Sequence, residues 1–180
     1  MRLESETIFL RPVELTDAEF IYGLRTDRTY NKYLSAVDDD VEKQRQWLEQ
    51  YKLKEARGQE YYFIICRKPD SKPVGTVRVY DFRENENSFC WGSWILNQDK
   101  PRYAALECAV LIYDFAFDRL GYARCHMDIR KENLKVIDFH KRFGVRIVGE
   151  TPLDLIGHYF VEDYKKIRQQ IVDVYSNPKA

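Results

Sequence analysis

Phe89-Cys-Trp-Gly-Ser-Trp-Ile95 leads through Leu96-Asn-Gln-Asp-Lys-Pro-Arg102 into a long apolar segment, Tyr103–Leu120, and this stretch decides the fold. The first part predicts a strand, the second a tight loop and the third a buried helix. A strand that runs into the N-terminus of a buried helix forms an anion site, because unpaired backbone N–H groups and the helix dipole point at the loop. We therefore expect a phosphorylated ligand at this loop.

The next segments extend the same unit. Arg124–Arg130 alternates apolar and polar residues, which predicts a strand. A helix is expected from Glu132 or Asn133 to Gly144. A strand–helix–strand order implies a right-handed crossover within a mixed sheet.

The remainder of the chain supplies the edges of this sheet and its closing helix. We expect an α/β (α+β) fold in one domain, 1–180, with a mixed, mostly antiparallel sheet of about six to seven strands and helices on both faces. A C-terminal helix is predicted over 163–176. The other expected strands are 7–11, 61–67, 74–82, 146–148 and 155–161.

Composition excludes several classes of protein. The 180 residues contain 29 Lys and Arg and 29 Asp and Glu, so the net charge lacks the basic excess of a nucleic-acid binder. The four cysteines are scattered, which predicts neither a metal site nor disulfides. No apolar run is long enough for a membrane span or a signal peptide, so no membrane partner and a cytoplasmic location are expected.

The order of the motifs resembles that of the GCN5-related N-acetyltransferases, the GNAT family. Ile8-Phe-Leu-Arg-Pro12 resembles the opening of the family, and Gly92-Ser-Trp-Ile95 the strand that receives the pantetheine arm. Glu132-Asn133 and Phe139-His-Lys-Arg-Phe-Gly144 resemble its last motif. Gly75 fits as well. The resemblance covers nearly the whole chain and implies the GNAT fold.

The resemblance also implies a reaction, direct transfer of acetyl from acetyl-CoA to a primary amine. It places Lys100 at the basic position of the pyrophosphate loop, Tyr103 at its glycine and Ala105 at its small residue. Cys90 stands where relatives that act on ribosomal-protein N-termini carry a glutamate. The expected acetyl-CoA contacts are Trp94, Ile95, Leu96, Lys100, Arg102, Tyr103, Ala104, Ala105 and Asn133.

Two residues are the candidates for catalysis. Asn133 and His140 lie seven residues apart, so two helical turns place them on one face. Asn133 could hydrogen-bond the pantetheine or the sulfur. His140 lies at the family's acid position, where an imidazolium could protonate the leaving thiolate. Packing in the core is the alternative role for His140.

The acceptor site is expected to include Arg25, Tyr80 and His158. His126 and His158 could each relay a proton through water, although a structural role is the stronger interpretation for both. Within the family, the resemblance is greatest to acetyltransferases of amino-sugar nucleotides and of ribosomal proteins. The predicted acceptor is the primary amine of a small molecule, namely an amino-sugar nucleotide. A protein N-terminus, a polyamine and a non-catalytic acyl-CoA-binding domain remain alternatives. The acceptor's identity and a homodimer are left open.

Overall fold

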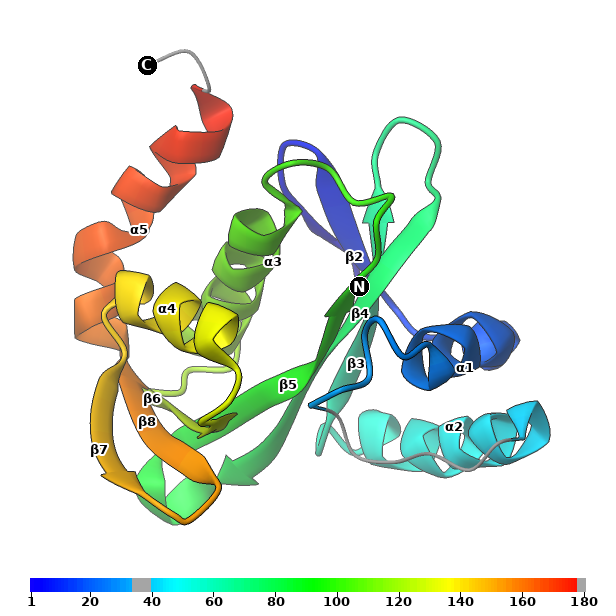
Figure 1. Ribbon diagram of the computed structural model, residues 1–180, viewed down its shortest axis with the longest axis horizontal. Helices are drawn as coiled ribbons and strands as arrows, with labels where there is room; N and C mark the ends of the chain where they lie inside the picture. Colours follow the sequence, from blue (N-terminus) through cyan, green and yellow to red (C-terminus); the bar gives the residue numbers. More distant parts are fainter. Residues whose placement is uncertain (34–39, 178–180) are drawn as a thin grey trace.

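The computed structural model describes residues 1–33 and 40–177. One mixed sheet of eight strands lies between two groups of helices (Figure 1), with the strand order β1-β2-β3-β4-β5-β6-β8-β7. The strands are β1 (Leu3–Glu4), β2 (Ile8–Pro12), β3 (Tyr61–Arg67), β4 (Pro73–Arg83), β5 (Ser88–Leu96), β6 (Arg124–Arg130), β7 (Arg146–Glu150) and β8 (Asp154–Phe160). The helices are α1 (Ala18–Thr26), α2 (Val41–Ala56), α3 (Ala104–Tyr113), α4 (Leu134–Phe143) and α5 (Val161–Ser176).

The mixed, mostly antiparallel sheet is confirmed, and the strand number is slightly higher than predicted. The additional strand is β1, which pairs with β2 through only two residue pairs. Two residues are too few to show an alternation of apolar and polar side chains, so this strand was not predicted from the sequence. The single parallel pair among the described strands joins β5 to β6.

The alternation of side chains along β3 shows why helices cover both faces. Phe63 and Ile65 enter the larger core, which is packed beneath α3, α4 and the start of α5. Tyr62 and Ile64 enter a smaller core beneath α1 and α2. Because successive side chains of a strand point to opposite faces, an unbroken apolar run of this length is buried on both sides.

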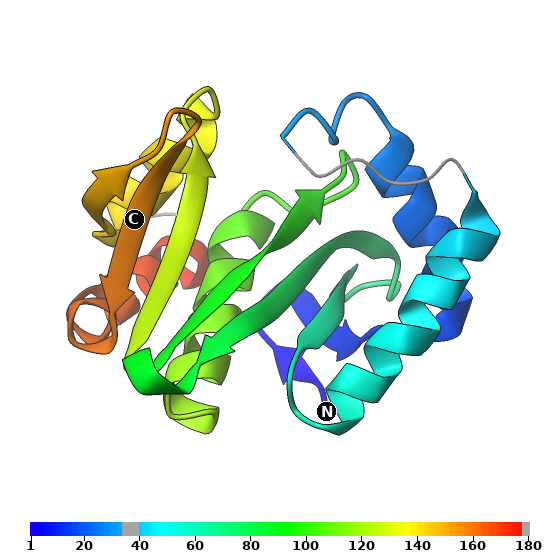
Figure 2. The same cartoon turned by 90° about the horizontal axis from the view of Figure 1, so that it is seen from below.

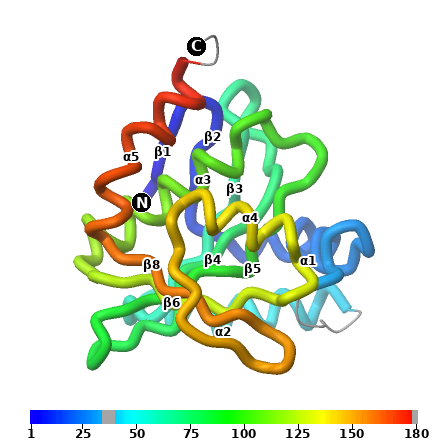
Figure 3. The backbone as a smooth tube through the Cα atoms, turned by 60° about the vertical axis from the view of Figure 1, so that its left-hand side comes forward, coloured from blue at the N-terminus to red at the C-terminus, as the bar shows by residue number. Residues whose placement is uncertain are grey.

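The helix predicted for Tyr103–Leu120 is divided in the structure. α3 ends at Tyr113, and Asp114–Arg119 continues it as a π-helix. The Asp114 carboxylate accepts hydrogen bonds from the Tyr164 hydroxyl and the Arg168 guanidinium, both on α5. These bonds tie the wider turn to the C-terminal helix, which begins two residues before the predicted start. Figure 3 shows α5 passing the N-terminal strands, where Ser176 contacts Glu6.

The sheet opens where β5 leaves β6. Only Ser88 and Phe89 pair with β6, opposite Arg124 and Cys125. Beyond these pairs the two strands diverge, which Figure 2 shows as a gap between the central strands and the β6–β8 pair. On one face of the sheet, α1 and α2 cover only β2 and β3. On that same face β5 and β6 carry polar side chains, and these lie beside the gap.

Candidate functional site

A β-bulge lies in the open part of β5. Thr76 of β4 pairs with Ile95, whereas Arg78 pairs with Gly92, so Ser93 and Trp94 together face the single residue between them. Ser93 has φ of +47°, a left-handed conformation that is rare outside glycine. The Thr76 hydroxyl donates a 3.0 Å hydrogen bond to the Ser93 carbonyl and holds this conformation. Bulges of this kind redirect the backbone groups of a strand, often beside active sites.

A cavity of about 260 Å³ adjoins the bulge. Its walls come from α1, the segment after α1 and strands β3 to β6. The lining residues are Arg25, Tyr33, Tyr62, Tyr80, Cys90, Trp91, Gly92, Ser93, Ile95 and Asp128. This volume is near the lower end of small-molecule sites, so it can admit the reactive end of a ligand and not a large molecule.

The structure brings together two of the three residues predicted to bind the acceptor. Arg25 and Tyr80 both line the cavity. His158 is not among the lining residues and lies on β8, opposite His126. Asp128 lines the cavity and was missed from the sequence. The signal was available, because Asp128 follows His126 by two residues and therefore points to the same side of the strand.

The loop between β5 and α3 carries exposed positive charge. Lys100 and Arg102 are exposed, and neither forms an ion pair with a carboxylate of the described residues. Asp99, by contrast, pairs with Lys72 at 2.7 Å. The free cations therefore stand at the N-terminus of α3, where backbone N–H groups already favour an anion.

Tyr103 does not distort this helix terminus. It is the N-cap residue of α3, with φ of −102°, a conformation open to any residue. The Arg102 guanidinium lies over its ring, 5.1 Å from the centroid. Ala104 is buried and Ala105 half-buried behind it, so small side chains line the first turn. A bulky residue at this position thus leaves the backbone conformation of the loop unstrained.

Glu107 has a role that extends beyond complementing the helix dipole. Its side chain is fully buried in the first turn of α3. The carboxylate accepts hydrogen bonds from the Thr7 backbone N–H at 2.8 Å, the Thr7 hydroxyl and, at 3.4 Å, the Ile8 N–H. These bonds fasten the start of α3 to β2 and fix the position of the preceding loop.

The two residues predicted to be catalytic lie on α4, and neither lines the cavity. Asn133 is the N-cap of the helix, and its side-chain oxygen accepts a 3.4 Å hydrogen bond from the Val136 N–H. His140 is buried, with its ring 5.6 Å from that of Trp91 and its Nδ1 atom without a partner among the described residues.

The environment of His140 bears on its predicted role as the proton donor. Burial lowers the pKa of His140 to about 4. The imidazole is therefore neutral near pH 7, whereas the prediction relied on an imidazolium with an ordinary pKa. The position of His140 in the helix could not predict that aromatic residues bury its ring, because Trp91 comes from a strand that is distant in sequence.

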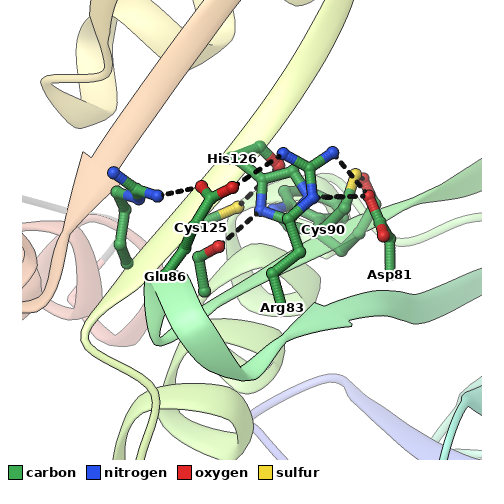
Figure 4. Close-up of polar contacts among 9 residues, drawn as sticks. Asp81, Arg83, Glu86, Cys90, Cys125 and His126 are labelled. Atoms are coloured by element: carbon green, nitrogen blue, oxygen red, sulfur yellow. Dashed lines mark hydrogen bonds and ion pairs between the residues drawn. The ribbon is translucent and has the colours of Figure 1, made fainter.

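His126 belongs to a polar cluster at the closed end of β5 and β6 (Figure 4). Its Nδ1 atom lies 3.0 Å from the Ser88 hydroxyl and its Nε2 atom 2.9 Å from an Asp81 oxygen. Arg83 donates to the same carboxylate at 2.8 Å. The hydrogen bond from Arg83 lowers the pKa of the Asp81 carboxyl group, and the contact with His126 contributes as well. The buried ring thus joins three strands, as a structural histidine does.

Two tyrosines connect the segment after α1 to the loops beside the gap. The Tyr30 hydroxyl accepts a 3.2 Å hydrogen bond from the backbone N–H of Gln98, in the β5–α3 loop. The Tyr33 hydroxyl donates a 3.0 Å hydrogen bond to the carbonyl of Glu132, between β6 and α4. One short segment therefore contacts both sides of the opening.

The described residues contain no cluster of three or more His, Cys, Asp or Glu side chains suited to a metal ion. None of the helices in the described part of the chain is long and apolar enough to cross a membrane. Both findings refer only to residues 1–33 and 40–177.

Comparison with known proteins gives a consistent result. A family model described as an acetyltransferase (GNAT) domain matches residues 7–146. The probable N-acetyltransferase YjcK of Bacillus subtilis (strain 168) is 29% identical, over 82% of this chain and 90% of its own. The solved apo structure of FdhC, a nucleotide-linked sugar GNAT, is 44% identical with a TM-score of 0.88, and the match covers 94% of this chain and 96% of that one.

A more distant structure shares the fold alone. The ribosomal-protein-S5-alanine acetyltransferase from Vibrio fischeri has a TM-score of 0.76 at 15% identity, covering 91% of this chain and 98% of its own. The two sequences have diverged so far that the match carries no information on the acceptor. The similarity to FdhC covers nearly the full length of both chains.

Proposed function

The chain belongs to the GNAT family of acyl-CoA-dependent N-acetyltransferases, and we propose that its acceptor is the amine of a nucleotide-linked amino sugar. GNAT domains use acetyl-CoA as the co-substrate. The observation that carries the acceptor proposal is the 44% identity to a nucleotide-linked sugar GNAT. Residues 1–180 would act as one acetyltransferase domain.

The basic loop is the proposed binding site for the pyrophosphate of acetyl-CoA. Lys100 and Arg102 are exposed and lack ion-pair partners among the described residues, and they stand beside the α3 terminus. Phosphate oxygens accept hydrogen bonds from both side chains and from backbone N–H groups. The pantetheine arm would continue along Trp94, Ile95 and Leu96 toward the bulge, with the acetyl group at the cavity.

The chemistry requires few groups. The nitrogen lone pair of the amine attacks the thioester carbon, the C–S bond breaks, and the amine proton is lost while the thiolate gains one. A backbone N–H at the bulge can polarise the carbonyl oxygen because the strand already fixes its direction. Neutral His140, in the aromatic packing of α4, contributes positioning in this scheme and no proton at pH 7.

The dimensions of the cavity support an acceptor that is only partly enclosed. A volume of about 260 Å³ can take an amine-bearing sugar ring, and the nucleotide would extend over the polar side of β5 and β6. Arg25 lines the cavity and is the proposed contact for a negatively charged group of the acceptor. A polyamine would need an acidic site. The sequence has three consecutive aspartates, Asp38, Asp39 and Asp40. Asp38 and Asp39 lie outside the described residues, and Asp40 caps α2.

The test has a binding arm and a turnover arm. Calorimetry should show micromolar affinity for acetyl-CoA, and the Lys100→Ala/Arg102→Ala double variant should bind about tenfold or more weakly through loss of charge-assisted contacts. The control is Lys43→Ala/Arg45→Ala, which removes two cations from α2. An equal loss in the control, or none in the double variant, would move the pyrophosphate elsewhere.

The turnover arm compares acceptors. The panel contains nucleoside-diphosphate-linked sugars with the amine at C2, C3 or C4, the free amino sugars, spermidine and a short peptide. Released coenzyme A is measured with a thiol reagent. We expect turnover with one nucleotide-linked sugar to exceed that of its free sugar by at least tenfold in kcat/KM. Preference for spermidine or the peptide would contradict the proposed acceptor.

A further inference from the structure

Asp128 is the only carboxylate that lines the acceptor cavity in the described part of the chain. The other lining residues are aromatic, aliphatic, neutral polar or, in Arg25, cationic. Asp128 is exposed, and none of the described residues forms an ion pair with it. A carboxylate without an intramolecular partner, directed at a cavity, is available to a positively charged ligand.

The thiol and the phenol beside Asp128 are neutral near pH 7. Burial raises the pKa of the Cys90 thiol to about 11, and the charge of Asp128 contributes to that shift. Burial likewise raises the pKa of the Tyr80 phenol, again with a contribution from Asp128. Near pH 7 neither the thiol nor the phenol competes as a negatively charged group. Asp128 therefore provides the negative charge in this cavity.

The fold fixes Asp128 relative to the bulge. His126, two residues earlier on the same side of β6, is held between Ser88 and Asp81. On the edge of β6 that faces away from β5, the backbone of Asp128 pairs with Ile156 in the continuous ladder between β6 and β8. Asp128 therefore lines the same cavity as Gly92 and Ser93, beside the opening between β5 and β6.

We propose that Asp128 binds the ammonium group of the acceptor and accepts the proton that nitrogen releases as it attacks the acetyl group. This inference rests on the proposed acetyltransfer and adds to it a catalytic residue. The bound ammonium first loses one proton to water, which gives the nitrogen the lone pair that attacks. The N–C bond then forms as the C–S bond breaks, the second proton passes from nitrogen to the Asp128 carboxylate, and the thiolate leaves with the electron pair of the C–S bond. Water then carries the proton from the carboxylic acid to solvent.

The experiment uses the full chain and the preferred amine from the acceptor panel. Three variants are compared, Asp128→Asn, Asp128→Glu and the control Asp138→Asn, which makes the same change at an exposed carboxylate on α4. We expect Asp128→Asn to lower kcat/KM for the amine about 100-fold, within the usual range for loss of a general base. Asp128→Glu should restore at least tenfold of that loss, and Asp138→Asn should remain within threefold of the parent.

Two further readouts separate a role at the amine from a general defect. Acetyl-CoA affinity by calorimetry should stay within twofold in Asp128→Asn. The hydroxyl analogue of the acceptor, which carries no ammonium, should inhibit the parent and Asp128→Asn equally. If the parent turns over the amine while Asp128→Asn keeps kcat/KM within threefold, this inference is overturned and the proposed function stands. If the parent acetylates no amine in the panel, the proposed function fails first.

Discussion

The two ends of β5 show how one strand performs two tasks. Its first end, at Ser88 and Phe89, pairs with β6 and is fastened by His126 to the β4 end at Asp81. Its second end carries the bulge at Ser93, with left-handed backbone, and lines the cavity. The closed end resists separation of the strands, and this allows the other end to remain open without ladder bonds to β6. Structural polar residues and functional polar residues are therefore sorted along a single strand.

The largest loss of stability and activity is expected from adding a methyl group to Gly75 of β4, next to the open end of β5. A Cβ atom on Gly75 would lie 2.1 Å from the backbone oxygen of Ile95, so β4 or the bulge must shift. Gly75→Ala should destabilise the fold by about 3 kcal/mol or more, the upper range for overpacking, and should abolish turnover. Urea unfolding and the coenzyme A release assay measure the two losses.

Gly23→Ala is the matched control for this substitution. No atom lies within 4 Å of a Cβ at Gly23, which is inside α1. The same methyl group should there stabilise the helix by about 0.5 to 1 kcal/mol. Wild-type turnover in Gly75→Ala would show that the bulge tolerates displacement and would break the contrast between the two ends.

A smaller effect is expected at the closed end. His126→Ala removes the partner of the buried Ser88 hydroxyl and one partner of Asp81, so a loss of about 2 kcal/mol is expected in urea unfolding. Acetyl-CoA affinity should stay within twofold, because the basic loop is distant in the fold. His158→Ala, at the half-exposed residue opposite His126, should cost no more than about 0.5 kcal/mol. Equal losses of stability in the two variants would contradict the proposal that the His126 cluster holds the closed end together.

The smallest predicted effect concerns pH and His140, which packs on Trp91 between the two ends. Its pKa is about 4 in the folded protein and about 6.5 in the unfolded chain. The unfolded state therefore binds more protons between these values, so this contribution to stability is present above pH 6.5 and is lost as the pH falls toward 4. From pH 7.5 to 5 the loss from His140 should approach 2 kcal/mol.

The measurement is urea unfolding at both pH values for the parent and for His140→Phe, which keeps an aromatic ring and does not titrate. The variant should lose less stability than the parent by about that amount. Because other groups titrate equally in both proteins, the difference isolates His140. Identical pH dependence would show that this residue keeps an ordinary pKa and would restore it as a proton donor at neutral pH.

Much of the fold was predictable from local sequence patterns. The apolar run of β3, the strand–loop–helix from Phe89 to Leu120 and the aspartate that opens α2 all act over a few residues. The division of α3 into α- and π-helical parts was not predictable, because Asp114 is bound by residues fifty positions later. The short strand β1 was missed for lack of length.

The candidate site was predicted in part for the same physical reason. Lys100 and Arg102 could be proposed as cofactor contacts because the loop and the helix terminus are adjacent in sequence. Asp128 was missed because its importance depends on the cavity wall formed by distant segments, including Arg25 and Tyr80. The protonation state of His140 depends on burial by β5 residues, which no spacing within α4 reveals. Candidate residues could thus be predicted from the sequence more easily than the surroundings that decide their chemistry.

The hydrogen bonds of Tyr30 and Tyr33 imply a coupling between the two substrates. One short segment touches the loop before α3 and the turn before α4, and Tyr33 also lines the acceptor cavity. Any displacement of either loop by acetyl-CoA is transmitted to the wall against which the amine binds. By thermodynamic reciprocity, if bound acetyl-CoA raises the affinity for the acceptor by some factor, the acceptor raises the affinity for acetyl-CoA by the same factor. We therefore expect synergistic binding, in which each substrate raises the affinity for the other.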